Sequence, residues 1–213
     1  MRRILPIVLL LTALAADVAP LAAQRTLAPV DQATRSASFQ RFRRQLTAAV
    51  ERKDADFVHS ILAPDVVNRS GGTGGVAEFR EMWDADHPAS ALWTTLGEVL
   101  RLGGAFRGDS VFEAPYVYTQ WPAGLDRFRY GTIVGTGVRV RGEPYLGAPI
   151  IGALSHDIVA TTGERGSNGF RAIQLADGSR GYVSTLYFRR PIDYHATFVR
   201  RNGSWLLKAL VAG

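Results

Sequence analysis

Residues that could bind a metal or a phosphate occur in two short stretches of the chain. Asp84, Asp86 and His87 follow one another closely, and carboxylate and imidazole groups are ligands that divalent metals take in proteins. Residues 70–75 read SGGTGG, a run whose backbone amides could receive an anion. The first stretch also reads as a polar helix end before Pro88, and the second lacks the lysine of a phosphate-binding loop. We predict no metal site and no cofactor.

Residue types for catalysis are also few. The chain has no cysteine, which excludes a cysteine nucleophile, a thiolate zinc site and a disulfide framework. No serine lies in a nucleophile-elbow motif, and the four histidines lack the spacing of a zinc protease. Glu78, Glu81 and Glu98 fall on expected helices, where solvated side chains are usual, although a carboxylate pair for sugar hydrolysis stays open. We predict no catalytic residues and a protein that is not an enzyme.

Aromatic and arginine side chains in the second half are better candidates, and the chemistry they suit is ligand binding. Tyr145 lies in an expected loop, and Tyr182 and Tyr187 lie near an expected last strand. Aromatic rings stack on peptide and sugar faces, and a neighbouring Arg141 or Arg180 could hold a carboxylate through two hydrogen bonds. Rings that share one surface would form a shallow groove. The alternative is that Tyr182 fills the core and Tyr187 only closes it.

A second aromatic group lies near the middle of the chain. Residues 111–121 read VFEAPYVYTQW, and their alternation predicts an extended segment. Tyr116, Tyr118 and Trp121 in this segment could line a pocket between the two halves of the molecule. The following residues, 122–131, are polar and contain glycine, which is typical of a linker.

The start of the chain has the pattern of an export signal. Arg2 and Arg3 precede a short apolar run, and small residues before position 24 suit cleavage after Ala23. The run is shorter than the roughly 20 residues of a membrane span. We therefore predict a signal peptide over 1–23 and an exported chain, periplasmic or extracellular, with no stable membrane insertion after cleavage.

Charge indicates the kind of partner. The formal charge of +6 falls to +5 when Arg2, Arg3 and Asp17 are removed with the signal. A basic exported protein favours anionic surfaces such as cell-wall polymers or lipid headgroups. Export argues against nucleic acid as the partner. The alternative is that the charge only keeps the protein soluble.

The elements that must position these residues change type along the chain. After a flexible lead-in over 24–34, apolar residues recur at helical spacing, which predicts a mainly helical domain over 35–131. Within it the expected helices cover residues 35–62, with a break at Lys53-Asp54, then 76–86 and 89–102.

From residue 132 onward the apolar period becomes two. Short apolar stretches alternate with glycine and proline, which predicts a small β-barrel over 132–190. Asp177-Gly178 predicts a type I′ hairpin turn inside it, and Asn202-Gly203, a preferred tight-turn pair, predicts the turn of a C-terminal hairpin over 191–213. The predicted fold class is α+β: a helical N-terminal domain, a small SH3-like barrel and a closing hairpin that packs on the N-terminal domain.

The barrel segment resembles the bacterial SH3-like (SH3b) domain in the order and spacing of many positions. The matching positions are Gly137, Val138, Val140, Arg141, Pro144, Pro149, Ile151, Gly152, Leu154, Val159, Gly169, Phe170, Ile173, Leu175, Asp177, Gly178, Gly181, Tyr182, Val183 and Tyr187. The chain departs from the family where Phe170 and Tyr182 stand in place of tryptophan. The resemblance implies a binding or scaffold protein, with a cell-wall peptide or an envelope protein as its partner.

A second resemblance covers the front half and the C-terminal hairpin. The order of helix, short helix, PDVV at 64–67, helix and late hairpin resembles the cone-shaped NTF2-like fold, with the barrel inserted before the last strands. It implies an alternative function: a pocket protein that binds a small molecule and could be an enzyme. A purely structural protein without a ligand is a third interpretation.

Overall fold

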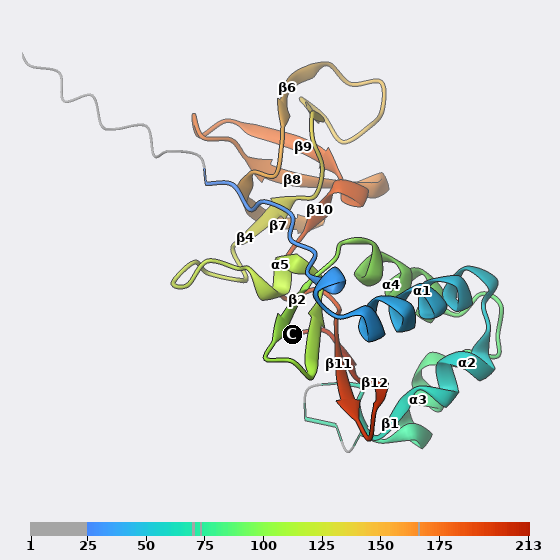
Figure 1. Cartoon of the computed structure of the whole chain (residues 1–213). Helices are drawn as coiled ribbons and strands as arrows, with labels where there is room; N and C mark the ends of the chain where they lie inside the picture. The colour runs from blue at the N-terminus through green and yellow to red at the C-terminus, as the bar shows by residue number, and fades with distance from the viewer. Residues whose placement is uncertain (1–24, 70, 73, 166) are drawn as a thin grey trace, which may run out of the picture.

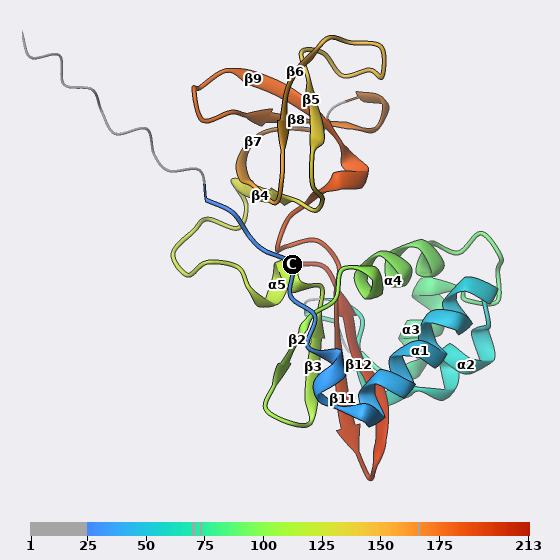
Figure 2. The same ribbon diagram turned by 45° about the horizontal axis from the view of Figure 1, so that its top comes forward.

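The chain forms two β-sheets that meet at a narrow junction (Figures 1 and 2). The computed structural model describes residues 25–69, 71–72, 74–165 and 167–213; the predicted signal peptide, 1–23, lies outside the described residues. No helix in these described ranges is long and apolar enough to cross a membrane.

The first sheet has five strands in the order β1-β12-β11-β3-β2. It is built from both ends of the chain, because β11 pairs antiparallel with β3 and with β12, while β1 runs parallel to β12. The C-terminal hairpin therefore forms the middle of this sheet. The strands are β1 (Leu62–Val67), β2 (Ala105–Arg107), β3 (Val111–Ala114), β11 (His195–Arg201) and β12 (Ser204–Val211).

Helices lie beside this first sheet (Figure 2). Three begin at a side chain that accepts a backbone N–H, namely Ser36, Asp54 and Ser90, as expected for residues that cap helices. The helices are η1 (Ala33–Arg35), α1 (Ala37–Arg52), α2 (Ala55–Ser60), α3 (Val76–Trp83) and α4 (Ala91–Arg101).

Aromatic rings join the helices to the sheet. Phe39 of α1 is fully buried, and its ring centroid lies 4.1 Å from that of Phe112 on β3 and 4.9 Å from that of Trp205 on β12. Phe198 of β11 completes this cluster at 5.8 Å. The prediction of a mainly helical N-terminal domain with a closing hairpin is therefore wrong. The helices are one layer of an α/β unit, whose central strands come from the end of the chain and so cannot be recognised from the front half alone.

The second sheet has seven strands in the order β10-β4-β7-β8-β9-β5-β6. Its buried residues come from all seven strands and include Ile133, Val140 and Val183, so the sheet bends around one small core (Figure 2). The strands are β4 (Tyr130–Ile133), β5 (Val138–Arg141), β6 (Ile150–Leu154), β7 (Ile158–Arg165), β8 (Phe170–Gln174), β9 (Arg180–Ser184) and β10 (Phe188–Arg189). Two 3-10 helices, η2 (Ser167–Gly169) and η3 (Thr185–Tyr187), lie between strands.

The prediction of a small closed barrel is also wrong. The edge strands β10 and β6 do not pair with each other, so the strands in the described ranges form an open, curved sheet. At one edge, β10 has only two residues and pairs with β4. At the other edge, Ile150 and Ile151 of β6 are exposed. Alternation of apolar residues predicts strands but does not specify whether the outer two meet.

The junction between the sheets is formed by the N-terminal segment and a short helix, α5 (Tyr116–Thr119). Leu27 N–H donates to the His156 carbonyl at 2.8 Å, and Gln32 N–H donates to the Gly104 carbonyl at 2.9 Å. Residues 25–32, expected as a flexible lead-in, are thus bonded to both halves. A salt bridge of 2.9 Å between Arg189 of β10 and Glu98 of α4 also crosses the junction.

Candidate functional site

A groove of about 340 Å³ runs along the second sheet beside β5. It is formed by the turn before β5, by β5 itself, by the loop from β5 to β6, and by residues at the start of β8 and around the end of β9. The lining residues are Gly135, Thr136, Gly137, Val138, Arg139, Arg141, Leu146, Phe170, Ser184 and Tyr187.

Two exposed apolar side chains line this groove. Leu146, in the loop between β5 and β6, is 77% exposed, and Tyr187 of η3 is 47% exposed. The ring of Tyr187 lies beside Gly135, where an added Cβ would be 3.5 Å from its Cδ1 atom. Buried side chains of Val138 and Phe170 lie beneath. Large apolar groups left exposed around a concavity are typical of a binding surface.

The groove carries positive charge. Arg139 is exposed and makes no ion pair within the part of the chain that the structure describes. Arg141 donates from Nη1 to the Ala148 carbonyl at 2.8 Å, which fixes the loop that carries Leu146. Among the described residues, those that line the groove include no Asp, Glu or His. The groove is therefore suited to an extended ligand with both apolar and anionic groups.

The structure brings together only some of the predicted site residues. Tyr187 and Arg141 line the groove, whereas Tyr145, Tyr182 and Arg180 do not. Tyr145 is exposed on the β5–β6 loop, with its ring against Gly147.

The other two predicted residues lie along β9. Tyr182 is half-buried opposite Arg141 in the β5–β9 register, so it neither fills the core nor lines the groove. Arg180 is exposed opposite Gln174, beside the β8–β9 hairpin turn.

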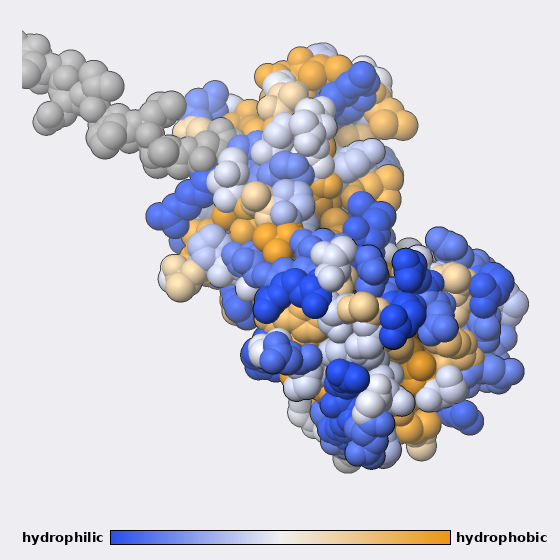
Figure 3. Space-filling view, viewed as in Figure 1, coloured by the Kyte–Doolittle hydropathy of each residue, from blue (hydrophilic) through white to orange (hydrophobic). Residues whose placement is uncertain are grey.

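Sequence reasoning missed Leu146 and Arg139, which both line the groove. The sequence pattern indicates the position of Arg139, because Arg139 alternates with buried Val138 and Val140 on β5. It therefore lies on the same face of the strand as Arg141. For Leu146, the sequence offers only its place in the same expected loop as Tyr145. Figure 3 shows apolar side chains gathered over the end of the second sheet that carries β6, the strand that follows this loop.

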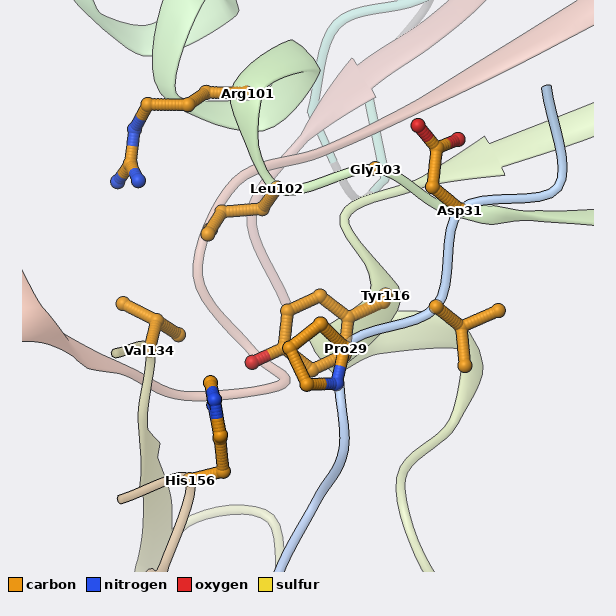
Figure 4. Close-up of a pocket in the computed structure, with 9 residues that line it drawn as sticks. Pro29, Asp31, Arg101, Leu102, Gly103, Tyr116, Val134 and His156 are labelled. Carbon is orange, nitrogen blue, oxygen red and sulfur yellow. The ribbon is translucent and has the colours of Figure 1, made fainter. Parts of the chain in front are cut away.

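The mid-chain aromatic residues separate in the structure. Tyr116 lines a second cavity, of about 310 Å³, at the junction of the sheets (Figure 4). Tyr118 instead stacks on His195. Trp121 donates from Nε1 to the Leu125 carbonyl at 3.0 Å. Of the three, only Tyr116 contributes to this cavity.

The stretches first considered for metal or anion binding have internal partners. His87 accepts the Ala89 N–H on Nδ1 at 3.1 Å, and the N–H of Gly74 donates to Glu78 at 2.6 Å. Among the described residues, no three His, Asp or Glu side chains gather in a way that could hold a metal ion.

Comparison with known protein families, with curated proteins and with solved structures finds no match to this chain.

Proposed function

We propose that this is an exported, non-enzymatic binding protein whose groove beside β5 recognises an extended, carboxylate-bearing peptide of the bacterial cell wall. One observation carries the proposal: the exposed Leu146 and Tyr187 lie along the same groove as Arg139, which has no acidic partner among the residues that the structure describes. Such a surface offers apolar contact and a site for a carboxylate together.

The resemblance to SH3b domains supports the class of ligand by analogy. Ligand binding in this groove does not require a closed barrel, because the groove is formed by β5, its flanking turns and the ends of β8 and β9. The described residues that line the groove include no Asp, Glu or His, which supports binding over catalysis, since general acid–base chemistry uses these side chains most often.

The alternative of a pocket in the front half has less support. Aromatic rings of Phe39, Phe112 and Phe198 fill the space between α1 and the first sheet, with centroid separations down to 4.1 Å. An NTF2-like function would place a ligand between the helices and this sheet. The NTF2-like resemblance itself stays a prediction.

The test is co-sedimentation of the purified protein with peptidoglycan sacculi at low and at high salt. Two tyrosines of matched exposure provide the variants: Tyr187, 47% exposed, lines the groove, and Tyr145, 49% exposed, does not. Tyr187→Ala should weaken binding about fivefold to tenfold, because covering the exposed half of the side chain contributes half of the roughly 1.5–3 kcal/mol that full burial gives. Tyr145→Ala should bind like the unchanged protein.

The salt dependence of binding distinguishes specific recognition by the groove from general electrostatic attraction. Binding that persists at high salt and depends on Tyr187 supports the proposal. Binding that disappears with salt in every variant would show only attraction between a basic protein and an anionic polymer. Failure of the unchanged protein to sediment with sacculi at low salt would refute a cell-wall ligand and leave an envelope protein as the candidate partner.

A further inference from the structure

The cavity at the junction of the two sheets is separate from the groove beside β5. Five segments far apart in the sequence line it: residues 29–31, the end of α4 at 101–103, Tyr116, Val134 and His156. Its volume of about 310 Å³ is at the lower end of the range for small-molecule sites. Its residues thus come from both halves of the molecule.

Tyr116 supplies an unpartnered hydroxyl to this cavity. The residue is only 1% exposed, and its hydroxyl makes no hydrogen bond within the described part of the chain. Figure 4 shows this oxygen directed into the space between Val134, Leu102 and His156. Burial raises the pKa of Tyr116 to about 12, although the charge of Arg101 acts in the opposite direction. The group is therefore a protonated donor at neutral pH, and buried donors normally have a partner.

His156 presents a second buried polar atom at the same cavity. Its Nδ1 is buried and makes no hydrogen bond to any residue that the structure describes, while its Nε2 lies 3.3 Å from the Thr136 hydroxyl. The backbone has a φ of 61°, in the left-handed region that is uncommon for residues other than glycine. The His156 N–H donates to the Gly135 carbonyl at 3.1 Å, which holds the residue in this conformation.

The described residues that line the cavity include one cation, Arg101, and one anion, Asp31. Arg101 is exposed and forms no ion pair among the described residues, yet its charge acts on the hydroxyl of Tyr116. Asp31 also lines the cavity, but both of its oxygens accept hydrogen bonds of 2.8 Å from Arg43. The carboxylate of Asp31 is thus already neutralised, whereas the guanidinium of Arg101 is not.

The remaining walls are apolar. Pro29, Val30, Leu102 and Val134 line the cavity beside the polar atoms. Figure 4 shows Leu102 and Val134 facing the space into which the Tyr116 hydroxyl points, with Arg101 extending on the same side as Val134. Among the described residues, the cavity thus has one cation without an ion pair, two buried polar atoms and apolar walls, which match a small ligand with one negative group and an apolar body.

We propose that the junction cavity binds a small organic monocarboxylate, with its carboxylate between Arg101, Tyr116 and His156 and its apolar body against Leu102 and Val134. A phosphate ion has no apolar body for these walls and carries more charge than one guanidinium balances. A neutral molecule would gain no charge-assisted hydrogen bond from Arg101. The proposal does not depend on the function assigned to the groove.

The test is a titration of the purified protein with hexanoate and benzoate, followed by NMR shifts of the residues that line the cavity. Hexanamide and benzamide have the same shape without the charge, and inorganic phosphate has charge without an apolar body. The carboxylates should shift Leu102 and Val134, and the amides should bind at least about tenfold more weakly, because charge-assisted hydrogen bonds are the stronger kind.

Three variants locate the contacts. Arg101→Gln should weaken hexanoate binding about tenfold, and Tyr116→Phe, which keeps the ring and removes only the hydroxyl, about fivefold. Arg44→Gln removes an exposed positive charge on α1 that does not line this cavity, and it should bind hexanoate unchanged.

Several outcomes would overturn the proposal. Equal affinity for carboxylate and amide would do so, as would phosphate that binds as tightly as hexanoate. The proposal would also fail if no probe at millimolar concentration shifted Leu102 or Val134, or if Arg44→Gln weakened hexanoate binding as much as Arg101→Gln. The first would show that charge plays no part. The second would indicate a bare anion site.

Discussion

The ring of Tyr118 stacks on the imidazole of His195 at the junction of the two sheets, with centroids 3.8 Å apart and planes 6° from parallel. Tyr118 belongs to α5, and His195 is the first residue of β11, where the chain re-enters the first sheet. The contact therefore joins the segment that leaves that sheet to the segment that returns to it.

The burial of His195 predicts a dependence of stability on pH. Burial lowers the pKa of His195 below its ordinary value of 6.5, and the charge of Arg127 acts in the same direction. Between the lowered pKa and 6.5 the unfolded chain binds a proton that the folded chain does not, so the free energy of unfolding should fall as the pH falls through this window.

The measurement is the thermal midpoint between about pH 7.5 and pH 5 for the unchanged protein and for His195→Phe, which retains a stacking ring but cannot titrate. The variant should lose part of the decrease on acidification. An identical pH profile for both proteins would mean that His195 is not the group responsible.

Two glycines in the second sheet should differ in how strongly substitution by alanine affects stability. A Cβ at Gly181 would lie 2.3 Å from Cγ1 of Val140, a buried residue on the adjacent strand β5. At Gly152 nothing lies within 4 Å. Gly181→Ala should lower the free energy of unfolding by about 1–3 kcal/mol through overpacking. Gly152→Ala should change it by less than about 1 kcal/mol. Urea unfolding measures both, and equal effects would contradict the close packing of β5 against β9.

The aromatic cluster of the first sheet should dominate the stability of that half. Phe39→Ala removes a buried ring that contacts rings on α1, β2, β3, β11 and β12, and should cost about 3–5 kcal/mol. Phe128→Ala, at an exposed position, should change the free energy of unfolding by less than about 0.5 kcal/mol. A small cost at Phe39 would show that the helices do not depend on the C-terminal strands for their core.

Local patterns predicted the helices but not their partners. The caps at Ser36 and Ser90 and the apolar spacing of α1 and α4 are local signals, and both helices lie within the expected ranges. The sheet that they cover depends on β1 pairing with β12, across 140 or more residues as at Leu62 and Leu207. No periodicity within the front half encodes such a pairing, so the first sheet was missed.

The sequence correctly predicts a tight turn at Asn202-Gly203 but wrongly predicts the turn type at Asp177-Gly178. Asn202 and Gly203 both have positive φ, of 50° and 83°, as a type I′ turn requires. At Asp177-Gly178 only the glycine has positive φ, of 83°, so the predicted type I′ turn is wrong. Asp177 instead accepts the Ser179 N–H at 2.9 Å through its side chain, a local bond that favours another turn.

The segment 111–121 shows a further limit of predicting structure from local sequence patterns. Its alternation predicted one extended piece, but the strand ends at Ala114 and α5 begins at Tyr116. This change of direction turns Tyr116 into the junction cavity and Tyr118 towards His195. The groove was partly predictable because strand alternation identifies the face of β5, whereas Leu146 depends on how a loop folds back.

Charge at the groove should appear in the salt dependence of binding. Arg139 lines the groove without an acidic partner in the described part of the chain, whereas Arg180 is exposed on the same sheet outside the groove. Arg139→Gln should weaken binding to sacculi about tenfold and reduce its sensitivity to salt, because one charge-assisted contact is lost. Arg180→Gln removes the same charge and should have little effect. Equal losses would mean that net charge alone drives the association.

The most direct test of the groove compares two exposed leucines. Leu146, 77% exposed, lines the groove, and Leu186, 71% exposed, does not. The measurement is the affinity of each serine variant for a soluble cell-wall peptide with free carboxylates. We predict that Leu146→Ser weakens binding about fivefold to tenfold, as expected for a partly covered leucine, and that Leu186→Ser binds unchanged. Equal affinity for the two variants would contradict a binding site in this groove.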